Sequence, residues 1–186
     1  MALTGALLLM MILSAALGSV VIVAGIERRV SAAYRVSVEL REAAAGAAAL
    51  TAGELERGDW TAALAGGGSA YWTLPQPGLD LAALTAAHQA ETMMAGAHGA
   101  DTPVWRVFAQ APWPVMTGAT ADAGAPHVVT WVADDWQEAD GSPGRDSNGR
   151  ILVRAAALRG PASAWLEGVG VKEPDGRVRL RHVRTW

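Results

Sequence analysis

The stretch from Ala2 to Gly25, ALTGALLLMMILSAALGSVVIVAG, holds twenty-four residues without a charged side chain. A helix rises about 1.5 Å per residue, so this stretch covers roughly 36 Å and exceeds a bilayer core of about 30 Å. It therefore predicts a membrane-spanning helix. A buried core helix is one alternative, but it would usually be shorter and show a polar face. A secretory signal peptide is another, because Ala15, Ala16 and Gly18 resemble a cleavage site, but the apolar run continues to Ala24.

The chain turns polar at Glu27 without a helix-breaking residue, and a helical composition continues to about Arg57. On a helical wheel, one sector of about 120° carries most of the apolar residues. These residues are Val30, Ala33, Val36, Leu40, Ala44, Ala47 and Leu55. Glu54 lies on the same side and is an exception. We therefore expect one continuous helix, with a transmembrane half over 1–26 and an amphipathic half over 27–58 that docks on a soluble domain.

Composition limits the classes of function. About 160 residues remain after the apolar run, which suits one compact soluble domain. The net charge is only -3 and no basic run is present, so we expect no nucleic-acid partner. Absence of cysteine removes disulfides, thiol catalysis and thiolate metal sites. The sequence holds no G-x-S-x-G or H-E-x-x-H motif, and its four histidines are scattered, so we expect no catalytic residues and no enzyme.

Basic residues around the apolar run bear on orientation. Arg28, Arg29, Arg35 and Arg41 follow the run, and nothing basic precedes it. The positive-inside rule, applied to this pattern alone, would keep the C-terminal part in the cytoplasm. The orientation would reverse only if a basic leader lies upstream of Met1.

Region 59–126 is predicted to connect the long helix to a sheet through helices and loops. Asp59 is a good N-cap for a short helix that begins at Trp60, and three glycines then stop it. Asp80 is the N-cap of a second helix over 81–96, LAALTAAHQAETMMAG.

Two features of this region are ambiguous. His88 and Glu91 stand three apart on the second helix and have the residue types of a metal pair, but no further ligands follow at metal spacing. We interpret them as an exposed polar pair on the helix surface. The segment 101–115 carries bulky residues between prolines, which predicts a loop or a short strand at the edge of the core.

The last third, 127–186, predicts an antiparallel β-sheet. Its four β-like runs lie at 127–135, 151–160, 162–172 and 177–186. Pro174, Asp175 and Gly176 form a tight-turn sequence, so the last two runs should make a hairpin. The short links favour a meander of about four strands whose apolar face the long helix covers. The expected fold class is α+β.

The loop 133–150 between the first two runs is acidic and rich in glycine. Its candidate calcium ligands are Asp134, Asp135, Asp140, Asp146 and Asn148. Glu138 lies in the same loop and is not one of these five candidates. Calcium takes several hard oxygen ligands at about 2.3 to 2.6 Å, and such a loop can fold them around one ion. The spacing does not match an EF-hand. The alternative is a solvated turn in which Asx side chains cap their own backbone.

The order of these features resembles a known family. Glu27 and Arg28, followed by Ala33, Tyr34 and Arg35 and then by REAAAGAAAL, are similar to the N-terminal region of type IV pilus minor pilins of the PilX kind. The downstream WVADD and DGSPGRDSNG segments add to the resemblance. It implies a pilin-like α+β fold and a leader removed by a prepilin peptidase. It also implies a single-pass inner-membrane protein whose C-terminal domain lies in the periplasm or in the surface pilus.

The resemblance also implies partners, namely other major and minor pilins, the pilus assembly platform and membrane lipid. Major pilins carry a glutamate where this chain has Gly5, which implies a different position in the filament, at the tip or in priming. Small residues permit close approach of helices in a membrane. The candidate helix-packing residues are Gly5, Ala6, Ser14, Ala15 and Gly18.

Three functions remain in order of preference. The first is a non-catalytic minor pilin of a type IV pilus or related pseudopilus. The second is a membrane-anchored periplasmic binding or sensing domain that responds to calcium. The third, an anchored hydrolase, lacks any motif in its favour.

Overall fold

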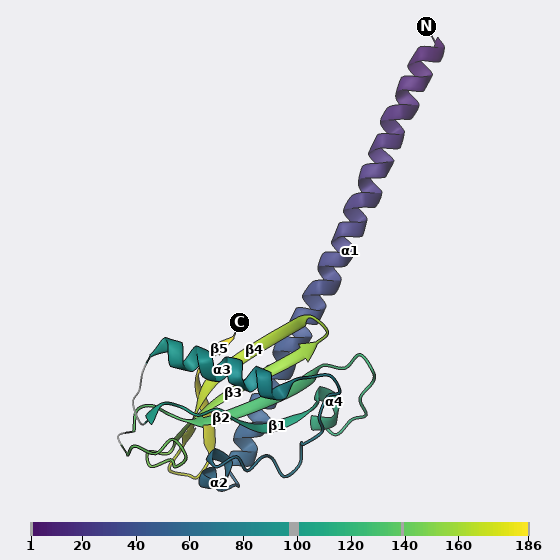
Figure 1. Cartoon of the computed structure of the whole chain (residues 1–186). Helices are drawn as coiled ribbons and strands as arrows, with labels where there is room; N and C mark the ends of the chain where they lie inside the picture. Colours follow the sequence, from purple (N-terminus) through teal and green to yellow (C-terminus); the bar gives the residue numbers. More distant parts are fainter. Residues whose placement is uncertain (1, 97–100, 139, 186) are drawn as a thin grey trace. The chain divides into compact units, whose positions relative to one another are not determined.

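A computed structural model describes residues 2–96, 101–138 and 140–185, without the side chains of residues 2, 4, 12 and 15. Its helices are α1 (Ala2–Leu55), α2 (Trp60–Leu64), α3 (Leu81–Ala95) and α4 (Trp113–Met116) (Figure 1). Its strands are β1 (Arg106–Pro112), β2 (His127–Asp134), β3 (Arg150–Arg159), β4 (Ala162–Lys172) and β5 (Val178–Thr185). The chain divides into two compact units, Met1–Val38 and Glu39–Trp186.

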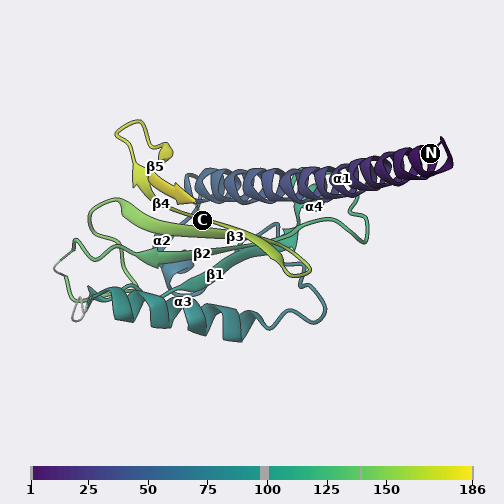
Figure 2. The ribbon, with the colours of Figure 1, turned by 90° about the horizontal axis from the view of Figure 1, so that it is seen from above.

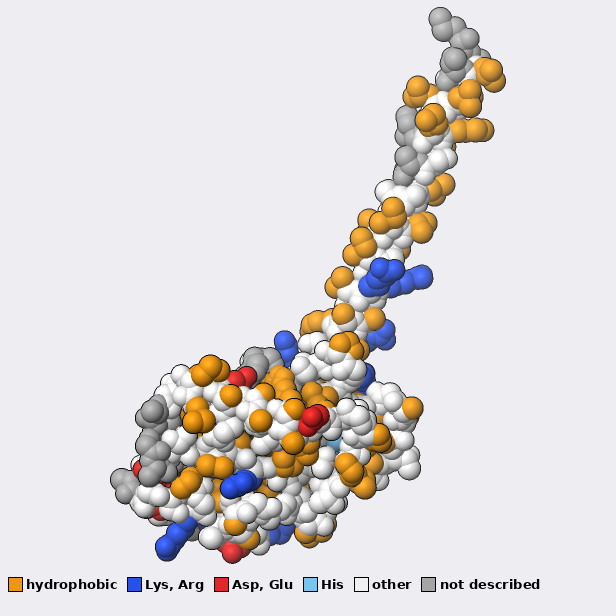
Figure 3. All heavy atoms as spheres, in the orientation of Figure 1, with side chains coloured by type: hydrophobic (Ala, Val, Ile, Leu, Met, Phe, Trp, Pro, Cys, Tyr) orange, Lys and Arg blue, Asp and Glu red, His pale blue; other side chains and the backbone are white. Residues whose placement is uncertain are grey.

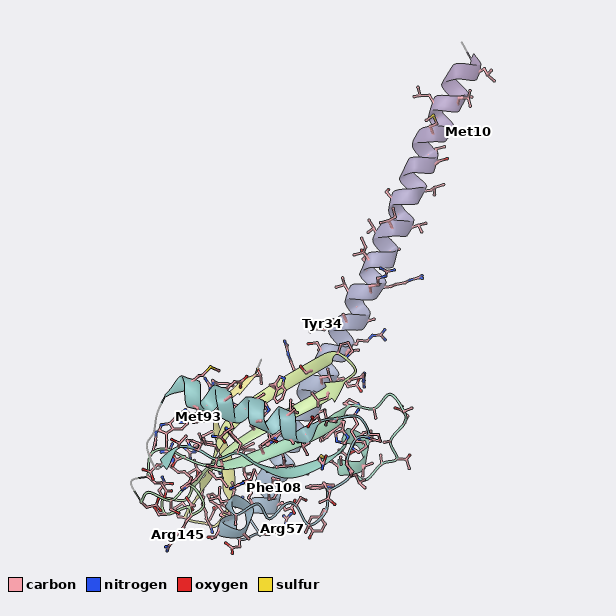
Figure 4. The ribbon with its side chains drawn as sticks, viewed as in Figure 1. Met10, Tyr34, Arg57, Met93, Phe108 and Arg145 are labelled. Carbon is pink, nitrogen blue, oxygen red and sulfur yellow. The ribbon has the colours of Figure 1, made fainter. Side chains whose placement is uncertain are left out.

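The helix α1 confirms the expectation of one continuous helix. It runs from Ala2 to Leu55 and is long and apolar enough to cross a membrane. Hydrophobic side chains cover its N-terminal part, and basic side chains follow further along (Figure 3). Figure 4 shows Met10 in the apolar part and Tyr34 beyond it, and both side chains are exposed. The first unit therefore has the surface of a helix suited to lipid or to other apolar helices.

The sheet is an antiparallel meander of five strands in the order β1-β2-β3-β4-β5. The expected count of about four strands is one too low. The additional strand, β1, comes from segment 101–115 and pairs with β2 between Arg106 and Pro112. Its apolar side chains pack in the core, although prolines at both ends of the segment resemble loop signals. The hairpin between β4 and β5 is confirmed, with Gly176 at a φ of 83° in the turn.

Helices cover both faces of this sheet within the second unit (Figure 2). On β2 every residue is buried, as expected for a strand covered on both sides. Thr130 faces the part of α1 from Glu39 onwards, where its hydroxyl accepts a hydrogen bond of 3.0 Å from Thr51. Trp131 faces the other way and packs in a cluster that includes Leu84 of α3. The sequence predicted that α1 covers one face of the sheet, but it did not predict that α3 covers the other.

The buried part of α1 presents mainly alanine to the sheet. Ala43, Ala44, Ala47 and Ala48 are all at most 1% exposed. These four short side chains are thus fully covered by the rest of the second unit. Burial of the predicted apolar stripe begins at Leu40, whereas Val30 and Ala33 further back are exposed.

Glu54, the polar exception in this stripe, has a structural task. Its carboxylate accepts hydrogen bonds from the Ser69 hydroxyl and the Ala70 backbone N–H, each 2.7 Å long. These bonds hold the start of an extended segment that runs beside β1. There the backbone N–H of Gln110 donates to Trp72 and the N–H of Leu74 donates to Gln110, both over 2.9 Å. The outer edge of β1 is thereby covered by the chain itself.

The opposite edge of the sheet, β5, is protected in another way. Arg179, Arg181 and Arg184 project from it, and most of the strand is exposed. The pairing with β4 shifts register between Glu167 and Val169, and His182 takes a positive φ of 53° at this irregularity. Charged side chains and bulges are known devices that discourage pairing with a further strand.

The two capping predictions are confirmed. Asp59 accepts a hydrogen bond of 2.9 Å from the backbone of Thr61 at the start of α2. Asp80 does the same for Ala83 at the start of α3, over 2.9 Å. Each carboxylate satisfies a backbone N–H that has no partner inside its helix.

Gly46 is predicted to be required for the contact between α1 and α4. A Cβ added at Gly46 would lie 2.7 Å from Cζ2 of Trp113 and closer still to Cη2, so the ring would have to move. We expect Gly46→Ala to lower the free energy of unfolding by roughly 1–3 kcal/mol, as overpacking does. Chemical denaturation of the full chain in detergent micelles, followed by circular dichroism, measures this change.

Gly53→Ala is the matched control in the same helix. A Cβ at Gly53 meets nothing within 4 Å. Alanine favours a helix interior over glycine by up to about 1 kcal/mol, so this variant should be as stable as the wild type or more so. Equal stability of the two variants would contradict the packing argument.

Candidate functional site

The acidic loop brings three carboxylates together. Ligand oxygens of Asp134, Glu138 and Asp146 lie within 4.8 Å of one another. Asp134 ends β2 and is buried, while the other two come from the connection to β3. Two of the five predicted ligands, Asp134 and Asp146, therefore belong to this cluster. Its third member, Glu138, was not among the predicted ligands.

The remaining predicted ligands are engaged elsewhere. Asp135 forms an ion pair with Arg150 at 3.4 Å and accepts a hydrogen bond of 2.9 Å from the side-chain amide of Asn148. Asn148 also donates its backbone N–H to Glu138 over 3.0 Å. Asp140 is exposed and accepts from the backbone of Ser142 over 2.9 Å. Of these contacts, the one between Asp140 and Ser142 is the Asx-type self-capping that the sequence offered as the alternative, whereas Asp135 is held by residues from the far end of the loop.

Burial and mutual repulsion set the electrostatics of the cluster. Burial, with the negative charge of Glu138 beside it, raises the pKa of Asp134 to about 7. Burial also raises the pKa of Asp146. Burial acts in the same direction on Glu138, but hydrogen bonds from Ser147 and Asn148 outweigh it and leave the pKa of Glu138 lowered.

The three carboxylates lie close enough to repel one another, and the negative charge of Glu138 raises the pKa values of both Asp134 and Asp146. A proton or a cation within the cluster would relieve this repulsion. Its three hard oxygen donors fit a calcium ion, which would take further ligands from backbone carbonyls and water.

A second polar group lies on the α3 face of the sheet. His88 is only 5% exposed, so the prediction of an exposed polar pair is wrong for this residue. It packs edge-on against the rings of Trp131 and Trp165, with centroid distances of 4.8 and 4.6 Å. Glu91, the other member of the pair, is exposed on the same helix. The polar ring of His88 can be buried because Arg154 of β3 is its hydrogen-bond partner, with Nη1 of Arg154 3.0 Å from Nδ1 of His88.

The hydrogen bond from Arg154 fixes the state of His88. A guanidinium only donates, so Nδ1 must accept and the neutral ring carries its proton on Nε2. Burial, and then the positive charge of Arg154, lower the pKa of His88. Within the described residues Nε2 has no hydrogen-bond partner.

Arg154 connects His88 to two carboxylates. Its Nε and Nη2 donate to the same oxygen of Glu167, at 3.0 and 2.5 Å, and its Nη1 donates to Glu91 at 3.2 Å. The guanidinium also lies 4.8 Å from the centre of the Trp105 ring, a cation–π distance. Burial would raise the pKa of Glu167, but hydrogen bonds from Arg154 and Arg184 outweigh it and leave the pKa lowered.

A cavity of about 590 Å³ borders this network. Glu91 and Thr92 of α3 line one side, with Trp105, Trp136 and Leu152 as its apolar surfaces. The ion pairs of Glu167 with Arg154 and Arg184 form a polar wall. The sequence prediction missed this cavity, because its residues come from six separate segments. The tryptophans were the only signal in the sequence.

The small residues proposed for helix packing lie in the first unit. Gly5, Ala6, Ser14 and Gly18 are exposed, and a Cβ added at either glycine meets nothing within 4 Å. The side chain of Ala15 lies outside the described part of the chain. These positions are therefore open to contact with lipid or with another helix.

Comparisons with known proteins leave the family open. No protein-family model, curated protein or solved structure matches the chain. The resemblance to minor pilins therefore stays a hypothesis carried by the sequence segments quoted above. Function has to be argued from the chain's own residues.

Arg154 is predicted to be a strong determinant of stability. Its side chain is 8% exposed and is the partner of Glu167, which is itself mostly buried. Arg154→Met would leave the Glu167 carboxylate without its main partner, and breaking a buried pair in this way costs about 3–5 kcal/mol. Denaturant unfolding of the full chain measures the loss.

Arg159→Met is the matched control from the same strand. Arg159 pairs with Glu39 at the surface. Exposed pairs contribute about 0–1 kcal/mol, so this variant should unfold close to the wild type. A loss at Arg154 no larger than the loss at Arg159 would contradict the role of the buried network.

Proposed function

We propose that this chain is a non-catalytic minor pilin, a structural and assembly component of a type IV pilus or a related pseudopilus. The observation that supports the proposal is the double use of α1. Its apolar start has the length and composition of a membrane span, and its end supplies core residues such as Leu40, Ala47 and Leu55 to the second unit. An anchor merely appended to a soluble domain would not supply that domain's core.

Small residues in the span support neighbouring helices as partners. Ser14 and Gly18 stand four apart, the small-xxx-small spacing that allows two helix backbones to approach closely. In this proposal the span packs among the spans of other major and minor pilins and contacts the assembly platform and lipid. Gly5 in place of a glutamate supports a special position, at the tip or in priming.

The proposed location is the inner membrane, with a single span and the second unit in the periplasm. Arg28, Arg29, Arg35 and Arg41 on the C-terminal side oppose this orientation under the positive-inside rule. A basic leader upstream of Met1 would balance them. Alkaline phosphatase fused after the C-terminus reports the orientation, because that enzyme is active only in the periplasm.

Gly18→Leu is predicted to impair assembly. A leucine at this position would separate helices that approach through Ser14 and Gly18. We expect recovery of other pilins in membrane co-purification to fall about tenfold, which corresponds to about 1.4 kcal/mol. The number of surface pili should fall in parallel. Western blotting of the co-purified pilins and electron microscopy of the cells measure the two effects.

Val20→Leu is the control, because Val20 lies on the opposite side of the helix and changes only apolar bulk. It should leave co-purification and piliation unchanged. Deletion of the chain tests the proposal as a whole. Normal pilus number together with normal twitching or secretion after deletion would refute a role in assembly.

We propose calcium response as a second candidate function, on the single observation that Asp134, Glu138 and Asp146 converge. The repulsion among these carboxylates marks a place where a cation would be stabilising. A domain that orders this loop only with calcium would present a calcium-dependent surface. This function is compatible with a periplasmic location of the second unit.

Asp134→Asn is predicted to remove both the calcium response and a pH effect. A carboxyl with a raised pKa contributes stability that is complete below its unfolded value of 3.8 and is lost as pH rises through about 7. Without calcium, Asp134→Asn should therefore be more stable than the wild type at pH 8, by on the order of a few kcal/mol, and by a clearly smaller amount at pH 5. With calcium, titration calorimetry should give a Kd at or below about 1 mM for the wild type only.

Asp140→Asn is the control, because Asp140 is an exposed acid of the same loop outside the cluster. It should bind calcium and respond to pH like the wild type. If the wild type gives no heat beyond dilution at millimolar calcium, the loop does not bind calcium and the calcium function is rejected.

A further inference from the structure

The cavity beside Arg154 has the size and position of a ligand site. Its volume of about 590 Å³ falls in the range of about 300–1,000 Å³ that small-molecule sites occupy. A neighbouring hollow of about 590 Å³ shares Trp136, Leu152, Glu167 and Arg184 with it. The two adjoin, so together they offer room for a ligand of more than one unit. All the lining residues belong to the second unit.

The charges around the cavity cancel. Glu91 and Glu167 bear one negative charge each, and Arg154 and Arg184 bear one positive charge each. These four groups are already joined by the ion pairs Arg154–Glu91, Arg154–Glu167 and Arg184–Glu167. An ionic ligand would therefore meet no excess of opposite charge. A neutral ligand is favoured.

The walls still offer both hydrogen-bond acceptors and donors. The carboxylate of Glu91 is 59% exposed, and Arg154 and His88 contact only its Oε2, so Oε1 makes no hydrogen bond among the described residues. Thr185 adds a hydroxyl at the rim, which can donate or accept. The indole of Trp136 is 44% exposed and supplies an aromatic surface next to these groups. Leu152 closes the apolar floor.

We propose that this cavity binds a neutral oligosaccharide. A sugar ring carries hydroxyls on its rim that both donate and accept, and C–H groups on its faces that pack on aromatic rings. Glu91 and Thr185 match the rim, and Trp136 matches the face. A purely apolar ligand would instead desolvate the ion pairs of the wall without replacing the lost water contacts.

The backbone around the cavity disfavours a peptide. Extended peptides bind by adding hydrogen bonds to an unpaired strand edge. Strands β3 and β4, which line the cavity, are paired on both sides. The third lining strand, β5, has an unpaired outer edge, but its arginines and the irregularity at His182 discourage pairing with a further strand. The available polar groups are thus side chains, as a sugar requires. This binding does not depend on the proposed filament role.

The test uses the full chain in a polyoxyethylene detergent, whose headgroup carries no sugar. The probes are the neutral trisaccharides maltotriose, cellotriose and tri-N-acetylchitotriose, with anionic sialyllactose and the cationic glucosamine trimer for comparison. Saturation-transfer NMR and calorimetry should detect at least one neutral trisaccharide with a Kd below about 1 mM, which corresponds to about -4.1 kcal/mol. The two charged probes should bind at least tenfold more weakly.

Variants assign the binding to the cavity. Trp136→Ala should weaken it at least tenfold, and Glu91→Gln, an exposed change that keeps the side-chain shape, should weaken it several-fold. Tyr71→Ala is the control, because Tyr71 is an aromatic residue that is 69% exposed and lines none of these hollows. It should bind like the wild type.

Three results would overturn the proposal. The first is that none of the neutral trisaccharides binds at 10 mM, a concentration about ten times the expected upper limit of the Kd. The second is that both cavity variants bind them as the wild type does. The third is Trp136-dependent binding of an unstructured peptide mixture in place of every sugar, which would make the cavity a peptide site.

Discussion

The packing of α1, from Glu39 onwards, against the sheet is the constraint on which the rest of the second unit depends. Alanines of α1 are buried there, and the ring of Trp113 in α4 reaches the helix backbone at Gly46. A single buried polar pair, Thr51 with Thr130, crosses this interface and fixes the position of the helix along β2. One turn later, Glu54 holds the segment beside β1. A shift of the helix would therefore disturb the sheet edge as well as the core.

The two faces of the sheet solve different problems. The α1 face is almost wholly apolar, so its contribution to stability comes from burial and close packing. The α3 face carries the Arg154 network, whose charges are costly to desolvate and are tolerated because each has partners. Such a network is worth little more than apolar side chains in its place would be, although the loss of one partner alone is costly. It holds Glu91 and Glu167 on the cavity wall, so the cavity lies on the face that carries these polar groups.

Local signals in the sequence were sufficient for much of the fold. Asp59 and Asp80 predicted two helix starts, and the turn at Gly176 predicted the last hairpin, because each of these features acts on residues next to it. The apolar run of α1 needed only length and composition. Sequence patterns therefore predicted the structure best where a residue acts on backbone within the same helical turn or the same tight turn.

Non-local features were beyond such reasoning. Burial of His88 depends on Arg154, a residue 66 positions away. For the segment 101–115 the sequence left a loop and a short strand as alternatives because prolines flank it, and the pairing with β2 decides for the strand. In the acidic loop the fold brings Glu138, and not Asp140, beside Asp134 and Asp146. The sequence indicates which residue types could form a site, and the tertiary contacts determine which of those residues come together.

The two edges of the sheet have a consequence for solubility at high local concentration. The segment around Thr73 pairs with the β1 edge, and the β5 edge carries arginines and the irregularity at His182. Neither offers a flat row of amides onto which a sheet from another molecule could grow. Copies of the second unit can therefore be crowded without amyloid-like stacking through these strand edges.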